Sequence, residues 1–360
     1  MTKKYSIIII ESMFFLFILS LCLGCGFSKA KDDKILEPIV VVDSIGRRIT
    51  LEKPVTRVAI ANAYNTDLTE LVVAFGCLDS IVGVDQNILW NTEAFHNRFT
   101  KEHLICNRDG LAINYEKVVD LKPDVLLISS KGSWYDAQEK LANFGIKVIV
   151  IDTHDLANFE NNCMLLGEIF NKPNRAKEIK DYFIGQLQYV QKQLAGVKKK
   201  KVYLECGSPG ATTMPGSYFY SLVQYTGADN IMEDAVERHV LPEAVILRNP
   251  DYIVKMSDRR WKYSYTPPTE KEHLLIRNEM KNRSGWEEID AVKYDRIFQL
   301  SYFSHCGASK IIGVLYVAKY LYPEYLPDLH PEKVFKIWLE RYLGLNYIAG
   351  HTYPAFKLED

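Results

Sequence analysis

Two segments of the chain share one pattern of polar and apolar positions. Residues 116–124 read Glu-Lys-Val-Val-Asp-Leu-Lys-Pro-Asp, and residues 243–251 read Glu-Ala-Val-Ile-Leu-Arg-Asn-Pro-Asp. Apolar residues recur with helical spacing after each Glu, and each proline ends the helix because it lacks an N–H and restricts the residue before it. The apolar runs that follow, 125–128 and 252–254, are typical of buried parallel strands. The pattern predicts a helix, a Pro-Asp turn and a strand, once in each half of the chain.

Apolar strands and amphipathic helices alternate along the rest of the chain. A hairpin is predicted around Ser44-Ile45-Gly46-Arg47, between the strand-like runs 39–43 and 48–51. Because parallel strands are connected by helices, the alternation predicts mostly parallel, helix-covered sheets. The remaining predicted strands are 57–61, 81–84, 126–129, 147–151, 201–205 and 296–300, and the predicted helices are 67–75, 136–144, 218–226, 307–321 and 331–343.

Residues 158–196 connect the two halves. Apolar side chains recur at helical spacing here, and the only proline lies at Lys172-Pro173. We therefore predict one long helix that joins an N-terminal lobe, 38–157, to a C-terminal lobe, 197–360. A chain of two similar α/β lobes usually binds its ligand in the cleft between them.

The N-terminus has the pattern of an export signal. Lys3-Lys4 precedes an apolar stretch, 13–23, that ends at Gly24-Cys25. The stretch is shorter than the roughly 20 residues that span a bilayer, so we predict a signal peptide at 1–24 and a flexible polar tether at 25–37. The Leu-Gly-Cys ending resembles the lipobox of bacterial lipoproteins, in which the cysteine is acylated. The alternative is an ordinary cleaved signal in which Cys25 is incidental.

Composition argues against several classes of function. The chain has 44 Lys and Arg against 45 Asp and Glu, so no excess of positive charge attracts nucleic acid. Five of its seven cysteines lie beyond the predicted signal peptide and Cys25. These five are too scattered for a disulfide framework or a zinc site with paired cysteines, and most are expected to be buried. The sequence has no Gly-x-Ser-x-Gly elbow, Walker loop or His-Glu-x-x-His segment. Nothing therefore predicts an enzyme or a resident cofactor.

Candidate ligand-binding residues lie in loops that follow the predicted strands, where open α/β sheets bind their ligands. Most of these loops are aromatic, which suits a bulky planar or catecholate-like ligand, and Arg238, Arg259 and Arg260 are placed to meet its acidic groups. The alternative is that several aromatic residues only pack in the core or at its rim. The candidates are Tyr64, Asn65, Trp90, Trp134, Tyr135, Tyr218, Arg238, His239, Trp261, Tyr302 and His305.

Direct capture of a metal ion is an alternative to binding of a bulky organic ligand. The loop after the first core strand offers Tyr64 and Asn65 but no histidine, and the chain has no histidine-rich insertion. We therefore predict no metal site built from protein ligands alone. His305, His239 and Tyr302 remain candidates for an axial ligand to haem iron or corrinoid cobalt, as does Tyr64.

The chain resembles the substrate-binding proteins of ATP-driven importers for iron chelates, haem and vitamin B12. The resemblance implies an α/β fold of two lobes with mostly parallel sheets joined by a single long helix, the class III periplasmic-binding-protein fold. It also implies a monomeric, lipid-anchored, extracytoplasmic protein that captures a ferric siderophore, haem or corrinoid and delivers it to the permease and ATPase of an ABC importer. The matching segments are 43–47, 54–58, 71–76, 81–84, 121–125, 227–230, 249–251 and 291–293.

The same resemblance implies a role for Glu116 and Glu243, since an acidic residue at this place on each lobe docks onto arginines of the permease in that family. One carboxylate on each lobe can report the spacing of the lobes, and charge pairing tunes recognition. The alternative is that each Glu only stabilises the first turn of its helix through the helix dipole.

A lipid-anchored sensor that binds ligand without transport is the other alternative for function. Whatever its downstream partner, we expect the two lobes to close only slightly around the ligand. A long connecting helix resists hinge bending more than flexible strands do, so local loop movement is the expected response.

Overall fold

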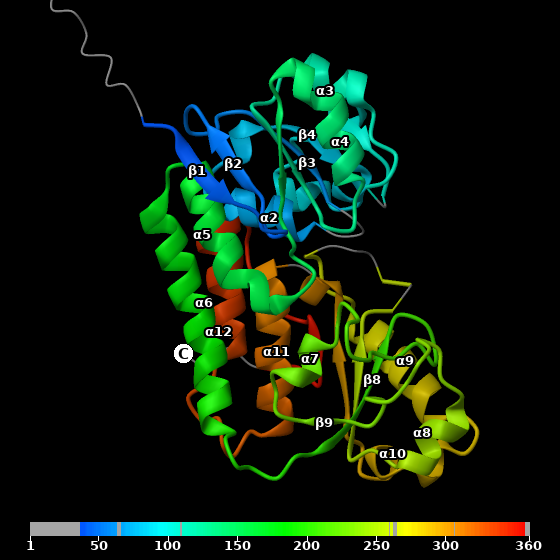
Figure 1. Cartoon of the computed structure of the whole chain (residues 1–360). Coiled ribbons are helices and arrows are strands. Elements are labelled where there is room, and N and C mark those ends of the chain that lie inside the picture. The colour runs from blue at the N-terminus through cyan, green and yellow to red at the C-terminus, as the bar shows by residue number, and fades with distance from the viewer. Residues whose placement is uncertain are drawn as a thin grey trace, which may run out of the picture. The chain divides into compact units, whose positions relative to one another are not determined.

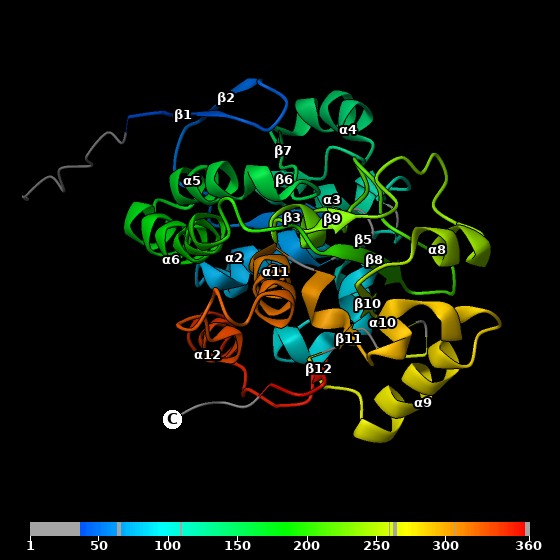
Figure 2. The ribbon, with the colours of Figure 1, turned by 90° about the horizontal axis from the view of Figure 1, so that it is seen from below.

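The computed structural model describes residues 37–62, 66–108, 110–258, 260–261, 265–305 and 307–356, apart from the side chains of Trp90, Ser304 and His305. Met1–Glu37 and Pro38–Asp360 are separate units. The predicted signal peptide, Cys25 and nearly all of the tether lie outside the described residues. The second unit contains a lobe built on each of two sheets (Figures 1 and 2).

The sheet of the first lobe has the order β5-β4-β3-β6-β7 in the described residues, and all its strands are parallel. A separate antiparallel hairpin precedes it, as predicted. The elements are β1 (Ile39–Val42), β2 (Arg48–Leu51), β3 (Val58–Ala61), α2 (Asp67–Ala74), β4 (Ile81–Asp85), β5 (Leu104–Cys106), α3 (Tyr115–Leu121), β6 (Val125–Ile128), α4 (Trp134–Leu141) and β7 (Lys147–Val150).

The sheet of the second lobe has the order β12-β11-β10-β8-β9 in the described residues, and β12 alone among them is antiparallel to its neighbour. The predicted helix at 218–226 is only one turn, α7. The elements are β8 (Lys201–Cys206), α7 (Ser221–Gln224), β9 (Asp229–Asn230), α8 (Pro242–Arg248), β10 (Tyr252–Met256), α9 (Glu270–Lys281), α10 (Asp290–Lys293), β11 (Ile297–Leu300), α11 (Gly307–Leu321), α12 (Pro331–Ile337), a π-helical turn (Trp338–Leu343) and β12 (Thr352–Tyr353).

The predicted pair of helix, Pro-Asp turn and strand is confirmed as α3–β6 and α8–β10. The residues before the prolines, Lys122 and Asn249, both end their helices in the left-handed conformation. A proline disfavours the α-helical conformation of the residue before it, so both helices end at the same point of the pattern.

The predicted long helix at 158–196 begins later than expected. The structure describes all of residues 159–193, and they form two packed helices, α5 (Phe159–Ile169) and α6 (Pro173–Gln193). Pro173 occupies the first turn of α6, where its missing N–H costs nothing, and Asn171 has a φ of 52°. The long helix that precedes the second lobe is therefore α6, with 21 residues.

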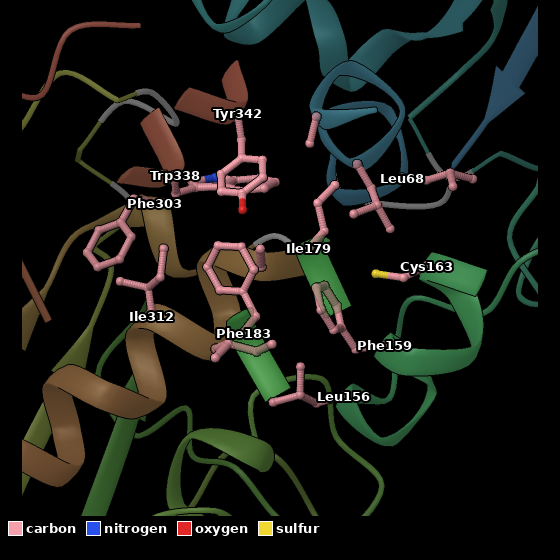
Figure 3. Close-up of a cluster of buried hydrophobic side chains, with 14 of the residues drawn as sticks. Leu68, Leu156, Phe159, Cys163, Ile179, Phe183, Phe303, Ile312, Trp338 and Tyr342 are labelled. Carbon is pink, nitrogen blue, oxygen red and sulfur yellow. The ribbon is translucent and has the colours of Figure 1, made fainter. Parts of the chain in front are cut away.

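Among the described residues, a continuous cluster of buried apolar side chains includes residues of both lobes. Figure 3 shows Leu68 of α2, Phe183 of α6 and Trp338 of the π-helical turn within this cluster. Every residue of α2 is buried, and the helix contacts both α11 and the π-helical turn. The two lobes are therefore joined through a shared core as well as through the chain.

Candidate functional site

The candidate site lies at the carboxyl ends of the strands in both sheets. In the first lobe, Tyr64 and Asn65 lie outside the described residues, as does the Trp90 side chain. Trp134 begins α4 and packs on the first-lobe core, with the Arg47 guanidinium 4.9 Å from its ring centroid. Tyr135 follows it and is 67% exposed. The structure thus gives Trp134 packing partners within its own lobe and leaves Tyr135 open to solvent.

In the second lobe, Arg238 and His239 run beside the segment that follows β8. Thr212 N–H donates to the Arg238 carbonyl at 2.7 Å, and the Ser208 hydroxyl lies 3.3 Å from His239 Nε2. Both side chains are exposed. The fold therefore brings this pair to the carboxyl edge of the sheet, as expected for residues that meet a ligand.

The remaining candidates differ in their surroundings. Trp261 is only 6% exposed and packs edge to face on His273, with 4.9 Å between ring centroids. Tyr302 is partly buried against the same second-lobe cluster. The His305 side chain and Arg259 lie outside the described residues. Core packing, the alternative considered for these aromatic residues, describes Trp261 well.

Arg260 is paired within its own lobe. Its Nε donates to Asp258 at 2.7 Å, and its two terminal nitrogens donate to the Glu279 carboxylate at 2.9 Å each. An Arg that already holds two carboxylates has little capacity left for an acidic ligand. Arg260 is therefore engaged within its own lobe, whereas the Arg238 side chain is exposed.

A buried ionic cluster supports this edge of the second sheet. The Glu205 carboxylate at the end of β8 accepts from both terminal nitrogens of Arg283, at 2.7 and 2.9 Å, and from Lys255 Nζ at 3.0 Å. Burial raises the pKa of Glu205, but the hydrogen bonds from Arg283 and the charge of Lys255 outweigh it and hold the pKa below its ordinary value. Gly210 N–H also donates to Glu205, at 2.9 Å. The cluster thereby fixes the loop that follows β8.

In the first lobe, Asp85 ends β4 in a fully buried position. Its carboxylate accepts from Asn87 N–H and Nδ2 at 2.8 and 2.7 Å, and from Asn62 N–H at 3.3 Å. Burial raises the pKa of Asp85 to about 7, and these hydrogen bonds oppose the rise. Asp85 therefore orders two loops of the candidate site, those after β3 and after β4.

Sequence reasoning missed the polar contacts between the lobes. The Tyr218 hydroxyl donates to Asp67 Oδ2 at 3.1 Å, and the Tyr265 hydroxyl donates to Glu70 Oε2 at 2.7 Å. Burial raises the pKa of Asp67, and the nearby Lys310 ammonium opposes the rise. Of these residues only Tyr218 is a sequence-predicted candidate, and the structure places its hydroxyl on the opposite lobe.

A second set of contacts between the lobes lies beside the first. Lys310 Nζ donates to the His154 carbonyl at 2.9 Å and lies 3.4 Å from the centroid of the Tyr218 ring. His154 follows β7, and its Nε2 lies 3.4 Å from the Gly216 carbonyl. Burial lowers the pKa of His154, and the Lys310 charge lowers it further. Both effects favour the neutral imidazole.

Glu116 and Glu243 lie in the first turns of α3 and α8, and both side chains are exposed. Exposure at matching places on the two lobes is what the docking hypothesis requires. It also agrees with a role limited to the helix dipole.

Neither a metal-binding cluster nor a membrane-spanning helix occurs in the part of the chain that the structure describes. No group of three or more His, Cys, Asp and Glu side chains there is arranged to hold a metal ion. None of the helices in those residues is both long enough and apolar enough to cross a membrane. The cysteines Cys77, Cys106, Cys163 and Cys206 are buried.

Comparison with known proteins identifies the relatives of this chain. The family model described as "Periplasmic binding protein" matches residues 62–302. An uncharacterized ABC transporter substrate-binding lipoprotein of Bacillus subtilis is 26% identical over 84% of this chain and 93% of its own length. A B. subtilis protein named as iron(3+)-hydroxamate-binding is 24% identical over 57% of this chain and 64% of its own.

Two further comparisons extend over most of the chain. The molybdate-binding protein MolA of Haemophilus influenzae is 20% identical over 91% of this chain and 97% of its own. The crystal structure of a TroA-like periplasmic binding protein from Veillonella parvula superposes with a TM-score of 0.75, covering 88% of this chain and 99% of that chain at 24% identity. The predicted fold class is thereby confirmed.

Proposed function

This chain belongs to the periplasmic binding protein family, and from that membership we propose that it is the extracytoplasmic solute-binding component of an ABC importer. The observation that carries the proposal is the fold itself. Each of the two lobes is built on a five-stranded, mostly parallel sheet, and each carries an exposed Glu in the first turn of a matched helix. A relative that shares most of the chain is named as an ABC transporter substrate-binding lipoprotein, which supports the assignment and supports lipid attachment at Cys25.

The proposed ligand is a metal chelate held between the lobes. The hydroxamate-binding relative supports a ferric chelate, and the exposed Tyr135 and Arg238 supply an aromatic surface and a cation on opposite lobes. Tyr135→Ala and Arg238→Ala are expected to weaken binding of the chelate without changing the unfolding midpoint. Tyr294→Ala is the matched control, because Tyr294 is also exposed, at 63%. It lies between α10 and the start of β11, whereas the candidate residues follow the carboxyl ends of strands.

A small oxyanion is the second candidate ligand, because the molybdate-binding relative aligns with 91% of this chain. Such a ligand needs hydrogen-bond donors rather than an aromatic surface. Tyr135→Ala would then leave affinity unchanged while Arg238→Ala lowered it. The pair of variants thus separates the two ligand classes.

The proposed delivery step uses Glu116 and Glu243 as contacts for basic residues of the permease. Charge reversal at exposed contacts mainly changes association with the partner. In cells that lack their own copy, the double variant Glu116→Lys/Glu243→Lys is expected to abolish uptake while the purified variant keeps its ligand affinity. Glu139→Lys/Glu287→Lys, at other exposed positions of each lobe, is the charge-matched control. Normal uptake by the first double variant would overturn the docking proposal, and a loss of affinity would move both residues to ligand binding.

A further inference from the structure

We propose that Asp67 and Glu70 of α2 are positioning residues that hold the two lobes at a fixed spacing through Tyr218 and Tyr265. The two carboxylates are one helical turn apart, and each accepts from a tyrosine hydroxyl of the other lobe, at 3.1 and 2.7 Å. The tyrosines lie 151 and 195 residues further along the chain. The consequences for ligand affinity and docking rest on the proposed function, whereas the effect on lobe spacing does not.

Burial makes these contacts consequential. Asp67 is fully buried and Glu70 is 2% exposed, and a buried carboxylate is costly unless its oxygens accept hydrogen bonds. The first lobe supplies part of the set, since Leu68 N–H donates to Asp67 at 2.8 Å and the Thr66 hydroxyl donates to Glu70 at 2.7 Å. The tyrosine hydroxyls add contacts that exist only while the lobes keep their present spacing.

Tyr218 is the centre of a second set of contacts across the same boundary. Its hydroxyl donates to Asp67, and the Lys310 ammonium lies 3.4 Å from the centroid of its ring. The centroids of the Tyr218 and His154 rings are 5.1 Å apart. Lys310 is itself 1% exposed and donates to the His154 carbonyl. Separating the lobes would break the Lys310–His154 and Tyr218–Asp67 bonds together, so these contacts act as a unit.

Two of the residues in these contacts lie at or near ligand candidates in the sequence. Helix α2 begins at Asp67, two positions after the candidate Asn65, and Tyr218 is a candidate itself. A change in lobe spacing therefore moves the ligand loops, and it also changes the separation of Glu116 and Glu243. By fixing the lobe spacing, α2 would set both the geometry of the ligand site and the distance between the two docking residues.

The test is the distance between spin labels on the two lobes of the purified mature chain, measured by pulsed electron paramagnetic resonance. Labels at Glu139→Cys and Lys271→Cys occupy exposed positions, whereas the described native cysteines are buried. Tyr218→Phe/Tyr265→Phe keeps both rings and deletes only the hydroxyls. We expect a broader, longer distance distribution and about tenfold faster amide exchange in α2, the scale of an unsatisfied buried hydrogen-bonding group. Ligand affinity is expected to fall as well.

The matched control is Tyr203→Phe. Tyr203 is buried and its hydroxyl donates to Glu205 at 3.4 Å within one lobe, so its loss should leave the distance unchanged. Glu70→Gln should also keep the spacing, because an amide can serve both the Tyr265 and the Thr66 hydroxyls, whereas Glu70→Leu should not.

An unchanged distance distribution and unchanged exchange in the double Phe variant would overturn the proposal. If the distribution broadens although no chelate or oxyanion binds the protein, the positioning role stands and the proposed function fails.

Discussion

Asp124 and Asp251 occupy the same place in the two lobes, and each ties the start of a neighbouring strand to the end of a helix. Asp124 Oδ2 accepts from Thr56 and Arg57 N–H at 2.8 and 2.9 Å before β3, and Asp251 Oδ2 accepts from Lys201 N–H at 2.8 Å in β8. Burial raises the pKa of Asp124, but the Thr56 and Arg57 hydrogen bonds outweigh it and lower the pKa. The Asp of each Pro-Asp turn thus fixes the start of its own strand relative to the start of the neighbouring strand.

Replacing either aspartate should destabilise the protein without affecting ligand affinity. We expect Asp124→Ala and Asp251→Ala each to lower the free energy of unfolding by about 1–2 kcal/mol, because the backbone N–H donors lose their charged acceptor. Asp120→Ala, at an exposed position of α3, is the control and should change little. Urea unfolding measures all three, and equal stability of the Asp251 and Asp120 variants would contradict the equivalence.

Two glycines of the linking region should respond in opposite ways to alanine. A Cβ on Gly167 of α5 would lie 2.5 Å from the Cβ of Ala176 in α6, whereas a Cβ on Gly185 of α6 meets nothing within 4 Å. We expect Gly167→Ala to cost about 1–3 kcal/mol by overpacking. Gly185→Ala should instead stabilise the helix by about 0.5–1 kcal/mol. Thermal unfolding of the two variants is the measurement, and a stabilised Gly167→Ala variant would mean that α5 and α6 are not packed this closely.

The buried Asp85 should make stability fall as pH rises. Its pKa is about 7 in the folded protein against 3.8 ordinarily, so the unfolded chain releases this proton at a lower pH than the folded chain does. The stabilising difference is complete below about pH 4 and is lost as pH rises from there through 7, at up to about 1.4 kcal/mol per pH unit. Asp85→Asn should lower the free energy of unfolding by the same amount at every pH, and it removes this pH dependence.

The measurement is the difference in free energy of unfolding between wild type and Asp85→Asn at pH 5 and pH 8. Wild type should lose stability relative to the variant at the higher pH. Asp120→Asn provides the exposed control, with no change in the difference. Parallel pH profiles for wild type and Asp85→Asn would show that Asp85 titrates normally.

Sequence patterns predicted most of the strands and the repeated unit, because these depend on local spacing and proline chemistry, but they missed the short strands β5, β9 and β12. They also predicted the helix at 67–75, which the structure has as α2, shortly before Gly76 with a φ of 69°. They missed α9, although Thr269 and Glu272 form a capping box that is visible in the sequence. They placed the start of the long helix too early, because the consequence of Pro173 and of the small Gly167 depends on how α5 packs against α6.

The candidate site was less predictable than the fold. The contacts of Asp67 and Glu70 depend on tyrosines more than 150 residues away, and no periodicity along the chain records such pairing. Burial likewise separates Tyr135 from Trp261, although both are aromatic residues in loops or at the edge of one. Exposure and interlobe contacts require the tertiary structure.

The shared core of the lobes predicts that ligand binding changes the protein's dimensions little. Because α2 of the first lobe contacts α11 and the π-helical turn of the second lobe within one apolar cluster, a hinge motion would have to expose buried apolar surface. Solution scattering should give the same radius of gyration with and without a saturating chelate. A clear decrease on binding would contradict this expectation.

The most direct test of the central claim is titration of the purified mature chain with haem, cobalamin, a panel of ferric siderophores, molybdate and free divalent metals, followed by absorbance and native mass. The account predicts saturable one-to-one binding of a single metal chelate, weakened by Arg238→Ala and Tyr135→Ala. Failure of every chelate, together with tight binding of a free divalent metal or of molybdate, would contradict it.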